Sequence, residues 1–341
     1  MTGGVGYGGP LDRAELFDPE TGLFRAVENK MRKRRFGHTA TLLDDGRVLL
    51  VGGYEEGLLE TLDSAEIFDP ADETFTRVGS EMNFGRALHT ATLLADGRVL
   101  VVGGTDGSNA FDTAEIFDPE TNSYSLVEDA MGIGRFAHTA TRIPDGRICV
   151  AGGLDGERTV PSATFFDPES GDFGRFDPTP EDEEEPMALG RMSHTATALP
   201  DGRIVFAGGF SGTQEGGEPT TSIEIFDFDT GTFDEAAGLT TPRSGQESVL
   251  LDDGRVLIVG GIDPQLTILS STEIFDPDDL SVSAGPAMNI ARTVARVTPL
   301  PSGSFFVSGG NGSADFFLPS PLSTAEILTP DAAAWALFPP R

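Results

Sequence analysis

The chain has 341 residues, with 55 acidic and 23 basic side chains and a formal net charge of -32. A surface of this sign repels phosphate backbones and anionic lipid headgroups, so neither nucleic acid nor a membrane surface is an expected partner. No stretch is apolar enough to span a membrane, and no membrane insertion is expected. Cys149 is the only cysteine, which excludes an internal disulfide bond.

The composition favours strands over helices. It includes 43 glycines, 23 prolines and 24 phenylalanines, and no long stretch is rich in alanine, glutamate, lysine and leucine. Such a composition is typical of many short strands joined by turns. We therefore expect an all-β chain with almost no helix.

A repeated segment begins with RFGHTATLLDDGRVLLVGG at residues 35–53. It contains a first strand, a turn whose glycine lies 11 residues after the arginine, and a second strand that ends in Gly-Gly. The other copies cover residues 86–104, 135–153 and 191–209, with weaker copies at 243–261 and 292–310. A segment that occurs six times in one chain is first of all a structural unit.

Two further strands are predicted after each Gly-Gly pair, beyond a variable loop. The third strand reads AEIFDP or similar, and the proline after aspartate ends it in a tight turn. The fourth strand is short and begins near an aromatic residue in most copies. The third strands are predicted at residues 14–19, 65–70, 114–119, 163–168, 223–228, 272–277 and 325–330.

Four strands that recur at about 50 residues, with a glycine pair ending the second, resemble the kelch repeat. The resemblance covers the whole chain, residues 1–341, and implies one domain: a kelch-type β-propeller of four-stranded blades. It is similar to bacterial kelch-like proteins and to the central domain of galactose oxidase. Kelch propellers include protein-binding modules, oxidases and sugar isomerases, so the resemblance implies a fold rather than a function.

The number of blades follows from counting strands. Seven Gly-Gly endings and seven outer strand pairs stand against only six first strands, which predicts six complete blades plus an N-terminal partial blade. We favour seven blades with the first one truncated, because MTGG at the start reads as if cut inside a second strand. The alternative is a six-bladed ring with a spare N-terminal hairpin.

The same reasoning bears on localisation. The N-terminus lacks the charged and apolar regions of a signal peptide, but an export signal would lie upstream of a truncated blade. The acidic composition suits a secreted, periplasmic or cell-surface protein, with a cytoplasmic protein as the alternative.

The parity of the strands sorts the loops onto two faces. The loops between second and third strands and the crossovers between blades share one face, which varies, whereas the other face carries uniform tight turns. Varied loops on a constant scaffold are where binding usually resides, so the variable face is the predicted functional surface. The acidic run at 181–185 in one crossover is expected to be a solvated loop, with calcium or a basic partner as alternatives.

The arginines that open the repeats are the candidate binding residues. The kelch resemblance places them around the mouth of the central channel, where guanidinium groups would attract carboxylate ligands or acidic side chains. The alternative is that each pairs with a carboxylate of the neighbouring blade and fastens the blades together. The candidates are Arg35, Arg86, Arg135, Arg191, Arg243 and Arg292.

Three other repeated positions are predicted to be structural. The third-strand glutamates (Glu15, Glu66, Glu115, Glu224, Glu273 and Glu326) are expected to face solvent or a neighbouring blade. The histidines (His38, His89, His138 and His194) follow the arginines by three residues and cannot converge on one metal ion, so we expect core histidines bonded to backbone at blade interfaces. Met31, Met82, Met131, Met187 and Met288, with Leu239, are expected to pack between units.

The predicted function is a non-catalytic binding scaffold, a monomer without cofactor or metal, that presents the loops of its variable face to a protein or glycan. The alternative is a carbohydrate-active enzyme of the kelch group, similar to the sialic-acid mutarotases. No inner position shows an unpaired histidine or glutamate to act as general acid and base. Copper chemistry of the galactose oxidase kind is rejected, because that group uses a tyrosine cross-linked to cysteine and Cys149 lies inside an apolar strand.

Overall fold

The structure is a computed structural model that describes residues 1–56, 60–127, 131–174, 187–213, 216–313, 320–330 and 334–338. The chain divides into two compact units, each described here by itself. The first contains Met1–Phe17 and Phe24–Arg175, and the second contains Asp18–Leu23 and Phe176–Arg341. The described residues form strands and turns without an α-helix, as predicted. None of them belongs to a helix that is long and apolar enough to cross a membrane.

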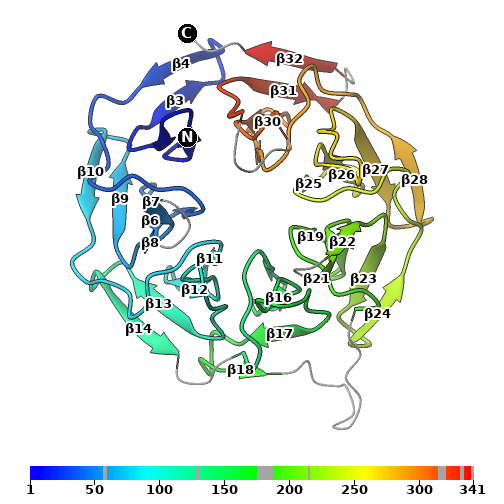
Figure 1. Cartoon of the computed structure of the whole chain (residues 1–341), viewed down its shortest axis with the longest axis horizontal. Helices are drawn as coiled ribbons and strands as arrows, with labels where there is room; N and C mark the ends of the chain where they lie inside the picture. Colours follow the sequence, from blue (N-terminus) through cyan, green and yellow to red (C-terminus); the bar gives the residue numbers. More distant parts are fainter. Residues whose placement is uncertain are drawn as a thin grey trace. The chain divides into compact units, whose positions relative to one another are not determined.

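The first unit contains three four-stranded antiparallel sheets, in each of which spatial order follows chain order (Figure 1). The first sheet is formed by β5 (Thr39–Leu42), β6 (Val48–Val51), β9 (Ala65–Asp69) and β10 (Thr74–Arg77). The second is formed by β11 (Thr90–Leu93), β12 (Val99–Val102), β13 (Ala114–Asp118) and β14 (Ser123–Val127). The third is formed by β15 (Thr139–Arg142), β16 (Ile148–Ala151), β17 (Ala163–Phe166) and β18 (Phe173–Gly174).

The second unit repeats this arrangement with three more sheets of the same topology. The fourth sheet is formed by β19 (Thr195–Ala198), β20 (Ile204–Ala207), β23 (Ile223–Asp227) and β24 (Thr232–Glu235). The fifth is formed by β25 (Glu247–Leu250), β26 (Val256–Val259), β27 (Thr272–Asp276) and β28 (Ser281–Ala284). The sixth is formed by β29 (Arg296–Pro299), β30 (Phe305–Ser308), β31 (Ala325–Thr329) and β32 (Ala334–Phe338). The six predicted four-stranded blades are confirmed, and the assignment of residues 1–341 to one domain stays a prediction.

Small two-stranded sheets account for the remaining strands. Three of them lie in loops that follow Gly-Gly pairs: β1 (Val5–Gly6) with β2 (Gly9–Pro10), β7 (Tyr54–Glu56) with β8 (Glu60–Thr61), and β21 (Phe210–Thr213) with β22 (Gly216–Pro219). The fourth pairs β3 (Glu15–Asp18) with β4 (Leu23–Ala26). Several of the variable loops are therefore hairpins with their own backbone pairing.

The uniform turns between first and second strands are stabilised by their own side chains. In the turn of the first sheet, Gly46 has a φ of 86° and its amide donates to Leu43 O. The carboxylate of Asp45 accepts from the amide of Arg47 at 3.0 Å and from its Nε at 2.7 Å. The same bonds recur at Arg98, Arg147, Arg203 and Arg255. The aspartate and arginine of each Asp-Gly-Arg turn thus hydrogen-bond to each other within the turn.

The core consists of second strands and of the side chains packed between successive sheets. All four residues of β12, Val99–Val102, are 0% exposed. Met82 joins Leu49 of the first sheet and Val101 of the second in one apolar cluster. The methionine position is buried in every repeat, with Leu239 in its place in the fifth. This confirms the predicted packing of these side chains between successive repeats.

Cys149 lies in β16 and is 1% exposed. Burial raises the pKa of its thiol to about 12, so it behaves as the small buried hydrophobic residue that the sequence predicted.

The N-terminal glycine pair repeats the geometry of the later pairs. The Gly3 amide donates to Arg13 O and the Gly4 amide to Arg35 O, as Gly52 and Gly53 donate to Ser64 O and Arg86 O. Gly3 and Gly4 have φ values of 60° and 93°, close to those of Gly52 and Gly53, 60° and 96°. The Gly-Gly pair of MTGG therefore has the hydrogen bonds and backbone angles of the later pairs, and the truncated seventh blade stays a prediction.

Candidate functional site

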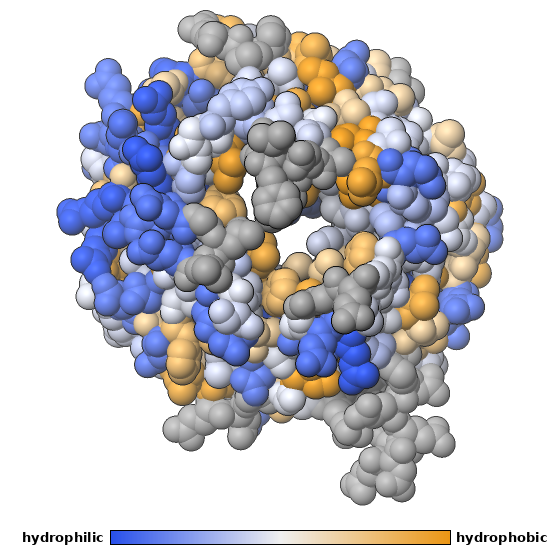
Figure 2. All heavy atoms as spheres, in the orientation of Figure 1, coloured by the Kyte–Doolittle hydropathy of each residue, from blue (hydrophilic) through white to orange (hydrophobic). Residues whose placement is uncertain are grey.

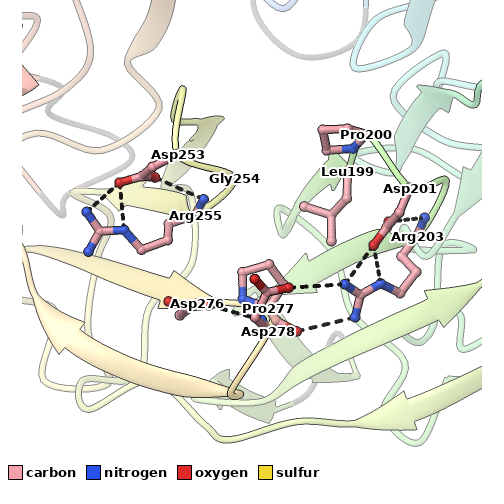
Figure 3. A pocket seen from close by; sticks show the side chains of 10 residues that line it. All are labelled: Leu199, Pro200, Asp201, Arg203, Asp253, Gly254, Arg255, Asp276, Pro277 and Asp278. Carbon is pink, nitrogen blue, oxygen red and sulfur yellow. Dashed lines mark hydrogen bonds and ion pairs between the residues drawn. The ribbon is translucent and has the colours of Figure 1, made fainter.

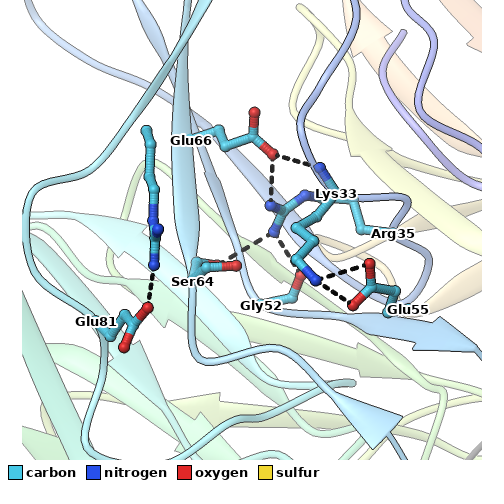
Figure 4. A network of polar contacts seen from close by, with 8 residues as sticks. Lys33, Arg35, Gly52, Glu55, Ser64, Glu66 and Glu81 are labelled. Carbon is cyan, nitrogen blue, oxygen red and sulfur yellow. Dashed lines mark hydrogen bonds and ion pairs between the residues drawn. The ribbon is translucent and has the colours of Figure 1, made fainter.

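The arginine that opens each sheet is buried rather than displayed. The side chain of Arg35 is 0% exposed. Its Nη1 donates to Gly52 O at 2.8 Å and to Ser64 O at 3.2 Å, and its Nη2 donates to Glu66 Oε1 at 2.9 Å (Figure 4). The same carboxylate accepts from the amides of Arg32 and Lys33. One glutamate on the third strand thus holds both the arginine and the crossover that leads into its own sheet.

This arrangement recurs in four other repeats. The pairs are Arg86–Glu115, Arg191–Glu224, Arg243–Glu273 and Arg292–Glu326. Both side chains of every pair are at most 3% exposed. For these five repeats, a ligand of the arginine would have to displace a buried carboxylate, and ligand binding by the arginines stays a prediction.

The expectation that the glutamates face solvent was wrong at these five positions. Each is buried in an ion pair with the arginine of its own sheet. Alternation along β9 puts Glu66 on the opposite face from Ala65 and Ile67. Because both faces of a stacked sheet are covered, the face that carries Glu66 is buried as well. The carboxylate of Glu66 can be buried there because Arg35 and two backbone amides donate hydrogen bonds to it. Glu15, in β3, is exposed as predicted.

The third repeat departs from the set. Thr164 stands at the glutamate position of β17, so Arg135 has no carboxylate partner among the described residues. Its Nη1 donates to Gly152 O at 3.0 Å and Ser162 O at 2.8 Å, and its Nη2 donates to Ser162 Oγ at 3.1 Å. Burial lowers the pKa of the Arg135 guanidinium to about 10.

The histidines lie between successive sheets. The Nε2 atom of His89, before β11, is 3.1 Å from Oγ1 of Thr39 in β5. His138 and Thr90 repeat this contact across the next junction at 2.9 Å. The predicted location at blade interfaces is confirmed for these two residues, and each ring contacts a threonine hydroxyl of the preceding sheet in addition to the backbone of Arg86 or Arg135. In the fifth repeat Gln246 takes the position and donates to Ala207 O at 2.7 Å.

A pH-dependent loss of stability follows from His138. Burial depresses the pKa of its folded-state imidazole to about 3 from 6.5, so the unfolded chain binds more protons between these two values. Stability from this histidine is complete above pH 6.5 and is lost as the pH falls, by about 2 kcal/mol at pH 5. We expect urea unfolding to show that the wild type loses about 2 kcal/mol more than His138→Gln between pH 7 and pH 5. Equal losses in the two proteins would contradict this, and Gln246 indicates that glutamine fits the position.

A second repeated feature lies two residues after each arginine, where the backbone adopts the left-handed conformation. The residues are Gly37, Leu88, Ala137, Ser193, Gly245 and Val294, with φ values between 50° and 64°. In the first unit Leu88 N donates to Gly37 O, and Ala137 N donates to Leu88 O. In the second unit Gly245 N donates to Ser193 O, and Val294 N donates to Gly245 O. Backbone hydrogen bonds thus link successive sheets at this position, which we call the left-handed position.

The left-handed position could not be recognised in the sequence, because its residue types share no property. The available signal was the fixed distance from the arginine. Val294 is 68% exposed and Leu88 is 40% exposed. A β-branched residue with positive φ is uncommon and costs about 1–3 kcal/mol. The fold therefore holds two apolar side chains toward solvent at strained backbone positions.

These residues lie at the predicted variable face. We call the corresponding end of each sheet its variable end, where the incoming crossover pairs with the residue after Gly-Gly, as in Ala87 with Thr105. Among the described residues, eight of the 14 exposed large hydrophobic side chains lie in the loops and crossovers at variable ends. They are Tyr7, Leu11, Phe84, Leu88, Ile133, Leu189, Leu266 and Val294. Hydrophilic side chains cover much of the visible surface around β7, β9 and β10 (Figure 2).

A pocket lies between the fourth and fifth sheets of the second unit, at the end opposite to their variable ends (Figure 3). It has a volume of about 390 Å³ and is lined by the uniform turns of the fourth and fifth sheets. Its arginines are engaged locally, since Arg203 bonds Asp201 and Pro277 O, and Arg255 bonds Asp253. The lining charges are largely paired with each other, so this pocket offers few groups for a ligand.

The residues that copper chemistry would use are dispersed. Tyr54 lies in β7, Tyr124 in β14 and Cys149 in β16, which belong to three different sheets. Within the described ranges, no group of three histidine, cysteine, aspartate or glutamate side chains could hold a metal ion. The donor set of this chain does not fit a copper centre.

Comparison with known proteins identifies the repeat. The Kelch motif matches residues 86–131, which contain most of the second repeat. None of the curated proteins compared with the chain matches it. A structure described as a novel fungal alcohol oxidase of the AA5 family in complex with copper is similar, with 18% identity and a TM-score of 0.72 over 93% of this chain and 68% of that chain. The structure of YjhT is similar with 14% identity and a TM-score of 0.65 over 89% of this chain and 97% of that one.

These similarities define the class as an all-β β-propeller, with the six four-stranded antiparallel sheets as its blades. The chain contains a Kelch motif and has the fold of two β-propeller structures, and the resemblance seen in its sequence is confirmed. Identities of 18% and 14% show the fold alone and carry no activity over to this chain.

Proposed function

We propose that the chain is a non-catalytic binding scaffold that contacts a protein or glycan partner with the loops at its variable ends. The supporting observation is the contrast between its charged and apolar residues. Five of the six arginines form buried ion pairs within their sheets, while apolar side chains at the variable ends are exposed. Exposed apolar groups rimmed by polar residues mark interaction sites.

Several loops at the variable ends have backbone pairing of their own. Paired hairpins such as β7–β8 and β21–β22 replace open loops, and the Lys33 side chain bonds Glu55 of β7 at 2.7 Å. Loops that are ordered before binding lose less conformational entropy in the complex. A protein or glycan partner would contact such a hairpin with little loss of conformational entropy.

Aspartate at the left-handed position tests this proposal. Leu88→Asp and Val294→Asp each place a charge at an exposed position with positive φ, which aspartate tolerates. We expect either variant to weaken binding at least tenfold, the effect of losing about 1.4 kcal/mol of contact energy, on a glycan array and against a displayed peptide library.

Leu280→Asp is the matched control for both variants. Leu280 is 41% exposed and has a φ of 60°, but it lies in the turn between β27 and β28, away from the variable end. Binding that is equally weakened in the control, or unchanged in Leu88→Asp and Val294→Asp, would contradict the proposal.

We further propose that residues 1–26 supply the outer half of a seventh blade. The Gly3–Gly4 geometry, the bridge between Thr2 and Ala14, and the β3–β4 pair support this assignment. The partner class, the monomeric state and an extracytoplasmic location remain proposals that rest on the sequence.

A further inference from the structure

Five repeats contain the same carboxylate-binding arrangement, filled by a side chain of the chain itself. In the second repeat Glu115 accepts from Arg86 Nη2 at 2.9 Å and from the Asn83 amide at 2.9 Å. In the fifth, Glu273 accepts from Arg243 Nη2 at 2.6 Å and from the amides of Thr240 and Thr241 at 2.6 and 3.1 Å. A buried guanidinium and backbone amides of the crossover thus form an anion site.

The third repeat retains the guanidinium, but no carboxylate of its described residues binds it. Thr164 is too short to reach Arg135, and its hydroxyl donates to Gly174 O at 3.1 Å. The crossover amides at the corresponding positions belong to Gly132 and Ile133, and neither has an acceptor within the described residues. Gly132 has a φ of 81°, whereas its counterparts in the other repeats have no positive φ. Without a carboxylate to bind it, this crossover adopts a different geometry.

We propose that the Arg135 position of the third repeat binds a small carboxylate anion from solution, of the size of formate or acetate. The difference between a threonine and a glutamate side chain is about one carboxylate group, which sets the size of the ligand. The anion would accept from Arg135 Nη2 and from the amides of the crossover, as the glutamates do in the five other repeats. This inference is independent of the proposed binding function.

Access and charge support this assignment. Gly132 is exposed and Ile133 is 42% exposed, so the crossover that covers Arg135 is open to solvent. Arg135 itself is 1% exposed, and its hydrogen-bond partners are neutral oxygens. A buried cation without a counter-ion gains more from an anion than a cation at the surface does. Burial already depresses the pKa of Arg135, and a bound anion would oppose that shift.

The experiment measures the Tm of the full chain in sodium acetate and in sodium chloride at equal ionic strength. At acetate ten times above its Kd we expect a rise of about 2 °C over chloride, since a ligand of the native state stabilises it by mass action. Thr164→Glu should raise the Tm without acetate and abolish the response to acetate. Thr164→Gln has a side chain of the same length without the charge. It should raise the Tm less than Thr164→Glu does and should suppress the response to acetate less.

The reverse substitution, Glu115→Thr, tests the proposal even if Thr164→Glu does not fold. Glu115→Thr gives the second repeat the residue of the third, and we expect it to be destabilised in chloride and to gain a second response to acetate. A Tm that rises equally in acetate and chloride overturns the proposal. A response to acetate that persists in Thr164→Glu also overturns it, because the anion would then bind elsewhere.

Discussion

Methionine in place of Arg86 is expected to lower the free energy of unfolding by about 3–5 kcal/mol, because it leaves the buried carboxylate of Glu115 without its counter-ion. Glu115 and Arg86 are both 0% exposed, and their 2.9 Å pair is shielded from water. The variant also removes the donors to Gly103 O and Thr113 O. Urea unfolding at pH 7 measures the loss.

Arg135→Met provides the control for this experiment, since Arg135 donates to equivalent carbonyls but pairs with no carboxylate in the part of the chain that the structure describes. We expect it to cost only about 1–3 kcal/mol, the effect of unsatisfied hydrogen-bond acceptors. Equal losses in the two variants would show that the carboxylate contributes little.

The sequence predicted the strands, the turns and the packing positions because each depends on local pattern. An Asp-Gly turn at a fixed distance from the arginine specifies a hairpin, and its aspartate bonds the next arginine in the structure as well. The methionine position could be assigned because it recurs at one place in successive repeats. These features need only neighbours along the chain or equivalent residues of the next repeat.

The partner of the arginine could not be predicted in this way. Arg35 and Glu66 are 31 residues apart, and pairing across the sheet brings them together only once both are buried. The repeated position predicted a glutamate that faces solvent or a neighbouring blade, because an isolated charge is rarely buried. The left-handed position has no residue signature at all, since tertiary hydrogen bonds impose its backbone conformation. Both features were set by packing, which the sequence pattern does not report.

Alanine in place of Gly103 is expected to cost more than about 4 kcal/mol, the range of severe backbone and packing defects. Gly103 is the first glycine of its pair and has a φ of 60°. A Cβ atom there would lie 2.5 Å from Arg135 O and 2.8 Å from Cε1 of His138, both in the next repeat. Arg135 O belongs to the backbone and the His138 ring is buried, so moving either atom away would cost free energy. The substitution would push two adjacent sheets apart.

Gly146→Ala separates this clash from the cost of the backbone conformation alone. Gly146 has a φ of 96°, and a Cβ atom there would meet nothing within 4 Å. It should therefore cost only about 1–2 kcal/mol, the penalty of a left-handed conformation for an L residue. If thermal and urea unfolding gave equal losses for the two variants, positive φ alone would account for the glycine pairs. A much larger loss at Gly103 would mean that the pair is glycine because the next blade approaches its backbone too closely for any side chain.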